Sequence, residues 1–250
     1  MTPVRLLRNT LPILAIVAIT MLGRQTAAAV DTASAEQAGA ILDATEVQGG
    51  IIVHVGCGNG ELTAALRASD ALQVQGLDRD WANVQAARNH VQELGIYGPV
   101  SVDRLTAKKQ LPYIDNLINL VVAEDLDGIP MKEVMRVLVP NGVAYVKVNG
   151  EWEKTVKPWP KNIDEWTHFM HSASNNAVAQ HDVVGPPRHL QWLGSPRWSR
   201  HHDRMASVSA MVSTKGRIFY IMDEGSRISI QLPAKWTLIA RDAFNGTILW

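Results

Sequence analysis

The sequence predicts an α/β protein built on a doubly wound parallel sheet, followed by an incomplete all-β segment. Between residues 51 and 150, short β-branched runs alternate with helical patterns. After residue 150 helical periodicity fades, and prolines and turn residues separate short strand-like runs. Seven of the eight tryptophans and all three phenylalanines also lie after residue 150. This shift in composition places a domain boundary near Gly150.

Residues 1–30 have the pattern of a signal peptide. Arg5 and Arg8 give a basic start, residues 11–22 are uncharged and apolar, and small residues 27–29 offer a cleavage site. The apolar run is shorter than the roughly 20 residues that span a bilayer. We therefore expect an exported protein of the periplasm or cell envelope, with an uncleaved membrane anchor as the alternative.

Charge and cysteine content narrow the classes of function. Lysine plus arginine and aspartate plus glutamate both number 24, so no net charge attracts the chain to nucleic acid. The single cysteine, Cys57, excludes an internal disulfide and a cysteine-based zinc site.

Residues 31–150 are expected to form one domain with five parallel strands. A helix over 34–45 comes first, and a strand that ends at Gly56 begins the alternation. Right-handed crossovers would then cover both faces of the sheet with helices. The expected strands are 51–55, 74–77, 100–105, 117–123 and 143–148, and the expected helices between them are 61–68, 81–94 and 131–138.

Residues 151–205 are expected to be a proline-rich linker, and 206–250 an all-β segment. Lys215-Gly216 and Asn245-Gly246 are its clearest turn signals. Because four strands alone leave an edge and both faces exposed, we expect this chain to be a fragment of something longer or to receive further strands from elsewhere. The expected strands are 207–213, 217–222, 236–241 and 247–250.

The run Val53-His54-Val55-Gly56-Cys57-Gly58-Asn59-Gly60 carries the chemistry of the first domain. Glycines between a strand and a helix permit positive φ and let a ligand approach the backbone. Asp78 ends the next strand, 22 residues after Gly56, where a carboxylate can accept hydrogen bonds from ribose hydroxyls. This combination predicts a nucleoside site.

Four stretches within residues 51–150, in the same order as in the family, resemble the Rossmann-like domain of class I S-adenosylmethionine-dependent methyltransferases. The resemblance is to the methyltransferase type 11 group of that class. The four stretches are 56–63, Gly76-Leu77-Asp78 with Ala87-Arg88, 111–122, and 133–142. The resemblance implies S-adenosyl-L-methionine as cofactor, with its methionine part near Gly56, Cys57, Gly58, Asn59 and Gly60, its ribose on Asp78 and its adenine beside Arg79. A nicotinamide cofactor fits less well, because its G-x-G-x-x-G motif needs glycine where Glu61 stands.

The chain departs from the family pattern where carboxylates are usual. His54, Ala107 and Asn119 occupy such positions, and Asp103 could replace the second only if its loop shifts. Each lost charge-assisted hydrogen bond is worth roughly 1.5–3 kcal/mol, so cofactor binding could be weakened. The family's further strands after the fifth are also expected to be missing, because Glu151 opens the linker.

No residue identifies itself as a catalytic base, and methyl transfer depends mainly on positioning. Glu124 and Asp125 follow the fourth expected strand, either facing the substrate or as solvated loop acids. Cys57 fits a small filler in the glycine loop better than a nucleophile.

Residues 238–250 resemble a blade of the pyrroloquinoline-quinone-type (PQQ-like) β-propeller repeat. In that blade Asp242 would cap a turn, Gly246 would permit it and Trp250 would wedge between blades. Such propellers are often scaffolds without a quinone. His168 and His171 could share a helical face, and His201-His202-Asp203 could extend a metal site, but surface hydrogen bonds are favoured and no metal site is predicted.

We therefore expect a methyltransferase that uses S-adenosyl-L-methionine on a small-molecule or protein-borne acceptor, with no nucleic-acid partner. The alternatives are an exported binding or scaffold protein with a degenerate methyltransferase fold, whose β-propeller binds other envelope proteins, and, less favoured, a quinone-dependent oxidoreductase.

Overall fold

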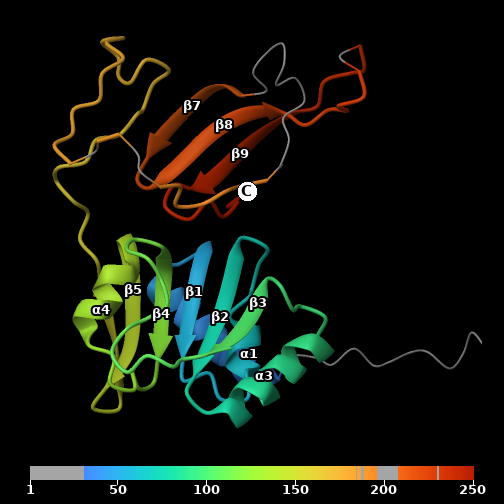
Figure 1. The fold of residues 1–250 in the computed structure, drawn as a ribbon, viewed down its shortest axis with the longest axis vertical. Helices are drawn as coiled ribbons and strands as arrows, with labels where there is room; N and C mark the ends of the chain where they lie inside the picture. The colour runs from blue at the N-terminus through green and yellow to red at the C-terminus, as the bar shows by residue number, and fades with distance from the viewer. Residues whose placement is uncertain (1–30, 184, 187–188, 196–207, 230) are drawn as a thin grey trace, which may run out of the picture.

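The computed structural model describes residues 31–183, 185–186, 189–195, 208–229 and 231–250. The expected signal peptide, residues 1–30, and His201-His202-Asp203 lie outside them. The described residues form two sheets, one above the other in Figure 1. None of the helices in these residues has both the length and the apolar character needed to cross a membrane.

The larger sheet has the strand order β3-β2-β1-β4-β5-β6. Its first five strands pair in parallel, as expected, and β6 pairs antiparallel with β5. The order reverses between β1 and β4, which confirms the Rossmann-like arrangement. The strands are β1 (Gly50–Val55), β2 (Leu72–Asp78), β3 (Val100–Arg104), β4 (Ile118–Ala123), β5 (Leu138–Val148) and β6 (Glu151–Val156).

Helices cover both faces of this sheet. Helices α1 (Thr32–Thr45) and α3 (Trp81–Glu93) supply buried residues to the core on one face, and α4 (Met131–Val137) supplies them to the core on the other. The short α2 (Glu61–Ala65) packs with α1. Helix α3 begins where the Asp80 carboxylate accepts a hydrogen bond from the backbone N–H of Ala82.

Two expectations for the larger sheet were wrong. Helix α2 ends at Ala65 rather than at residue 68, and the chain after Gly150 forms strand β6 before any linker. Strand β6 was missed because it lies at the sheet edge and has no buried residue, so its sequence lacks an apolar run. Its Trp152 stacks on Tyr145 of β5, with ring centroids 4.9 Å apart.

The smaller sheet contains β7 (Val208–Thr214), β8 (Arg217–Asp223) and β9 (Trp236–Asp242), paired antiparallel in that order. A strand was expected at residues 247–250, but the structure has none there. These residues nevertheless run beside β9. The Leu249 N–H donates to the carbonyl of Ala240, and the Ala240 N–H donates to the carbonyl of Trp250.

The smaller sheet contacts the amino ends of the parallel strands. The arrowheads of β1 and β4 point away from it in Figure 1. The amide of Asn119, near the start of β4, donates to Asp242 at the end of β9 (2.7 Å). The amide of Asn245 donates to the carbonyl of Leu117 (3.0 Å). The smaller sheet therefore does not cover the carboxyl ends of these strands.

Candidate cofactor site

The glycine loop follows β1 and turns sharply. Gly56, Gly58 and Gly60 all have positive φ, between 53° and 87°. A Cβ added at Gly60 would lie 2.7 Å from the Cβ of Ala87, so glycine there lets the loop lie against α3. The backbone N–H of Gly56 donates to the carbonyl of Leu77 (2.8 Å), which fixes the loop beside the end of β2.

Asp78, the last residue of β2, is buried beneath this loop. One carboxylate oxygen accepts from the Gly58 N–H (3.0 Å) and from the amide of Asn83 (3.2 Å), and the other accepts from the Asp80 N–H (2.8 Å). A carboxylate has about four acceptor positions, so three protein donors leave room for one more. Asp78 is therefore positioned by the loop and keeps some capacity for a hydroxyl donor.

A cavity of about 260 Å³ opens at the carboxyl ends of β1, β2 and β4. It lies at the point where the strand order reverses, where open α/β sheets bind their ligands. Among the expected site residues, Gly56, Asp78, Arg79, Glu124 and Asp125 line it, while Cys57, Gly58, Asn59 and Gly60 do not. Its other lining residues are Val55, Leu77, Leu105 and Asp127.

Arg79 ties together the two loops that border this cavity. Its guanidinium donates to the carbonyls of Ala107 (2.9 Å) and Lys108 (3.1 Å) in one loop and to the carbonyl of Asp127 (2.9 Å) in the other. It also forms an ion pair with the Asp127 carboxylate. Sequence reasoning placed adenine beside Arg79 but missed this role, because carbonyl acceptors carry no sequence signal.

The two acids after β4 are held by different partners. Glu124 pairs with the amino group of Lys147 (2.8 Å), and a carboxylate oxygen of Asp125 accepts from the Asp127 N–H (2.8 Å). Both remain exposed at the cavity mouth. Their position allows them to face a bound molecule, and their exposure also fits solvated loop acids.

Cys57 and His54 belong to the interior. Burial first, and then the Asp78 carboxylate, raise the pKa of the Cys57 thiol to about 12, so it stays protonated and fits the expected filler. The His54 ring shares a hydrogen bond with the Thr63 hydroxyl (2.8 Å), and burial lowers its pKa to about 4. Neither side chain lines the cavity.

The interpretation of Asn119 as a carboxylate lost from the cofactor site was wrong. Asn119 lies near the amino end of β4, whereas the cavity lies at the carboxyl end. Its amide oxygen accepts from the Ile51 N–H (2.8 Å) and from the amide of Asn245 (2.7 Å). Residue 119 therefore serves the contact with the smaller sheet.

Asp103, the possible substitute for an acid at position 107, does not line the cavity in this structure. Its carboxylate is exposed and pairs with Arg88 (3.2 Å). Ala107 contributes its carbonyl to Arg79 instead.

His168 and His171, both among the described residues, make local contacts. His168 and His171 form a β-bridge with each other, so the expected shared helical face was wrong. His171 binds the carboxylate of Asp164 through Nε2 (2.6 Å) and packs edge-on against Trp166. Within the described ranges, no three potential metal ligands gather in one place.

Comparison with known proteins agrees with the resemblance of the first domain. Residues 52–142 match the family model described as a methyltransferase domain. No curated protein matches the chain.

Part of the chain is also similar to solved structures. A putative S-adenosyl-L-methionine-dependent methyltransferase from Methanococcus maripaludis is 18% identical, with 45% of this chain and 54% of that chain covered and a TM-score of 0.41. The [4+2]-cyclase SpnF is 25% identical, with 45% and 43% covered and a TM-score of 0.41. Geranyl diphosphate C-methyltransferase from Streptomyces coelicolor, in complex with S-adenosyl-L-homocysteine, is 19% identical, with 44% and 42% covered and a TM-score of 0.40. The match therefore spans about half the length of these structures.

Residues 52–142 are thus similar to a methyltransferase domain. This match agrees with the enzyme class expected from the sequence, a methyltransferase that uses S-adenosyl-L-methionine.

Proposed function

We propose that the cavity at the carboxyl ends of β1, β2 and β4 binds S-adenosyl-L-methionine and that the domain transfers its methyl group to an acceptor at the cavity mouth. The observation that carries this proposal is the pairing of a glycine loop with a buried carboxylate. Gly56 and Asp78 line one cavity, and Asp78 keeps an acceptor position for a ribose hydroxyl.

The chemistry proposed for the chain's own residues is positioning. The loop backbone and Asp78 would orient the nucleoside, and Arg79 would keep the two bordering loops together around it. When bound, the cofactor supplies an electrophilic methyl group for in-line attack. Glu124 and Asp125 lie where they could orient an acceptor or accept its proton.

Calorimetric titration of the full chain with S-adenosyl-L-methionine and with S-adenosyl-L-homocysteine tests the proposal. Asp78→Asn should weaken binding by about 10- to 100-fold, because a charge-assisted hydrogen bond worth roughly 1.5–3 kcal/mol is lost. Asp70→Asn is the matched control, since Asp70 is an exposed acid of the loop before β2. Circular dichroism checks that both variants fold.

Two results would overturn the proposal. One is the absence of binding by the folded wild-type chain, and the other is equal affinity in Asp78→Asn and wild type. A methyl acceptor is then sought by incubating the wild type with labelled cofactor and candidate small molecules or proteins.

Export and the propeller remain part of the proposal. The pattern of residues 1–30 supports export, and sequencing the amino terminus of the secreted protein tests it; an intact Met1 on protein retained in the cytoplasm contradicts it. The ladder bonds between residues 249–250 and β9 support a fourth strand of a propeller blade. Hydrogen exchange tests this, since the Leu249 amide should be protected as strongly as that of Ala240.

A further inference from the structure

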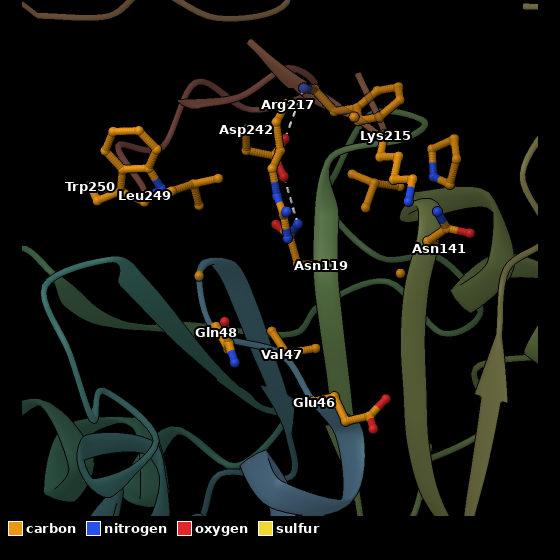
Figure 2. A pocket seen from close by; sticks show the side chains of 16 residues that line it. Glu46, Val47, Gln48, Asn119, Asn141, Lys215, Arg217, Asp242, Leu249 and Trp250 are labelled. Atoms are coloured by element: carbon orange, nitrogen blue, oxygen red, sulfur yellow. Dashed lines mark hydrogen bonds between the residues drawn. The ribbon is translucent and has the colours of Figure 1, made fainter. Parts of the chain in front are cut away.

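A second cavity, of about 340 Å³, lies between the two sheets, at the end of the parallel sheet opposite the cofactor cavity. Figure 2 shows it from close by. Ligand sites commonly occur at domain interfaces and measure roughly 300–1,000 Å³, so this volume suits a small ligand. Gln48, Asn119 and Asn141 line it from the first domain, and Lys215, Arg217 and Trp250 line it from the smaller sheet.

The acidic groups in this cavity have partners other than its cations. The buried Asp242 carboxylate accepts from the Asn119 amide (2.7 Å) and from the N–H groups of Phe244 (2.8 Å) and Asn245 (3.1 Å). Glu46, at the rim, lies 3.5 Å from the amino group of Lys154. Both acids keep their negative charge, but within the described residues neither forms an ion pair with Lys215 or Arg217.

The basic groups, in contrast, have no partner. Across the described residues, the side chains of Lys215 and Arg217 take part in no hydrogen bond or ion pair, and both are exposed. Figure 2 shows them extending from the smaller sheet into the space that faces Asn119 and Asn141. Within the described residues, neither cation therefore makes a direct ion pair with a carboxylate, although the acids Glu46 and Asp242 also line the cavity.

The turn that carries these charges is held from both sides. Both oxygens of the Glu165 carboxylate accept from it, one from the Lys215 N–H (2.6 Å) and one from the Thr214 hydroxyl (2.9 Å). The carbonyl of Gly216 accepts from the Ala243 N–H (2.8 Å). A fixed backbone reduces the ordering cost of bringing two cations to one ligand.

The opposite wall offers neutral hydrogen-bonding groups. The exposed amides of Gln48 and Asn141 come from the segment after α1 and from within β5. An amide can both donate and accept, so these side chains can bind hydroxyl or further acidic groups of a ligand. Trp250 adds an aromatic surface at the rim.

From these observations we propose that the cavity between the two sheets binds a small anion. Its phosphate or carboxylate group is held by Lys215 and Arg217, and its remaining polar groups meet Gln48 and Asn141. Because the ligand contacts both domains, its binding stabilises their contact. The site is separate from the cofactor cavity and does not depend on the proposed function.

Titration calorimetry and thermal unfolding of the full chain test this proposal, with pyrophosphate and citrate as probes and sodium chloride at matched ionic strength as reference. Pyrophosphate should bind and raise the midpoint of unfolding. Lys215→Ala and Arg217→Ala should each weaken binding about tenfold, since each removes one charged contact. Arg227→Ala is the control, because Arg227 is an exposed arginine after β8 that does not line the cavity.

The outcomes separate the alternatives. Binding of pyrophosphate alone assigns the site to phosphates, and equal binding of citrate extends it to carboxylates. No binding beyond the salt reference, or binding that both alanine variants retain in full, overturns the proposal. Asp78→Asn should leave pyrophosphate affinity unchanged, so failure of the cofactor proposal is recognisable separately.

Discussion

His54 shows how one buried side chain makes stability depend on pH. It lies inside the first domain, bonded to Thr63, and burial lowers its pKa from 6.5 to about 4. Between these values the unfolded chain binds a proton that the folded chain does not. The contribution of His54 to stability is therefore complete above about pH 6.5 and is lost as the pH falls towards 4.

We expect the free energy of unfolding to fall between pH 6.5 and pH 4 by up to about 3 kcal/mol more in the wild type than in His54→Asn, at about 1.4 kcal/mol per pKa unit. Asparagine keeps a hydrogen-bonding group near Thr63 but does not titrate. Urea unfolding at several pH values measures the difference. If the two proteins instead showed parallel pH profiles, the pKa of His54 would be the same in the folded and the unfolded chain, and the prediction would be wrong.

At the scale of elements, one arginine connects α4 to the chain before β4. Arg136 binds the Glu133 carboxylate (2.6 Å) and the Asp115 carboxylate (2.6 Å), and it donates to the carbonyl of Tyr113 (2.9 Å). Hydrogen bonding from Arg136 is also the main reason that the pKa of Glu133 is lowered. The planar guanidinium can make these contacts together, whereas an ammonium group cannot.

Arg136→Lys should therefore lower the free energy of unfolding by about 1–2 kcal/mol, although the charge is kept. Arg67→Lys is the matched control. Within the described residues, the Arg67 guanidinium forms an ion pair with the exposed Asp70 alone and its Nε has no hydrogen-bond partner, so the exchange should cost close to nothing. Urea denaturation of both variants measures the two changes. A similar loss of stability in both variants would mean that the planar shape of the Arg136 guanidinium does not account for its contribution to stability.

The strands and helices of the first domain were largely predictable from the sequence, because the residues that they bury are mostly apolar. Buried parallel strands such as Ile118–Ala123 are continuous apolar runs, and the spacing from Gly56 to Asp78 follows from one strand, one helix and the next strand. Strand β6 was not predictable in this way, since an exposed edge strand tolerates charged residues such as Glu151 and Glu153.

The site was predictable only in part. Spacing placed Asp78 and the acids after β4 at the cavity. Asn119 was assigned to the cofactor site from the family pattern, although the expected strand 117–123 already placed it near the amino end, where the structure finds it. The bridge made by Arg79 depends on carbonyl groups, which every residue possesses, so only three-dimensional structure reveals it.

At the scale of the whole molecule, Asn119 joins the two domains. It bonds to Ile51 within its own sheet and to Asp242 and Asn245 of the smaller sheet. Replacing its amide by a carboxylate removes the donor to Asp242 and sets two like charges against each other. The contact between the domains should then weaken.

We predict that Asn119→Asp lowers the free energy of unfolding by about 1–3 kcal/mol and speeds amide exchange in residues 242–249, while affinity for S-adenosyl-L-methionine stays at the wild-type value. Gln73→Glu, on an exposed position of β2, is the matched control and should change neither. Calorimetry and hydrogen exchange measure these effects. Tighter cofactor binding in Asn119→Asp, without loss of stability, would return residue 119 to the cofactor site.

The parallel sheet separates two tasks along its length. Its carboxyl ends hold the cofactor cavity and its amino ends hold the smaller sheet, about 17–20 Å apart for strands of five or six residues. Substitutions that alter ligand preference at one end can therefore accumulate without disturbing the attachment of the neighbouring domain. In the same way, a change in the smaller sheet at the amino ends leaves the residues that line the cavity at the carboxyl ends in place.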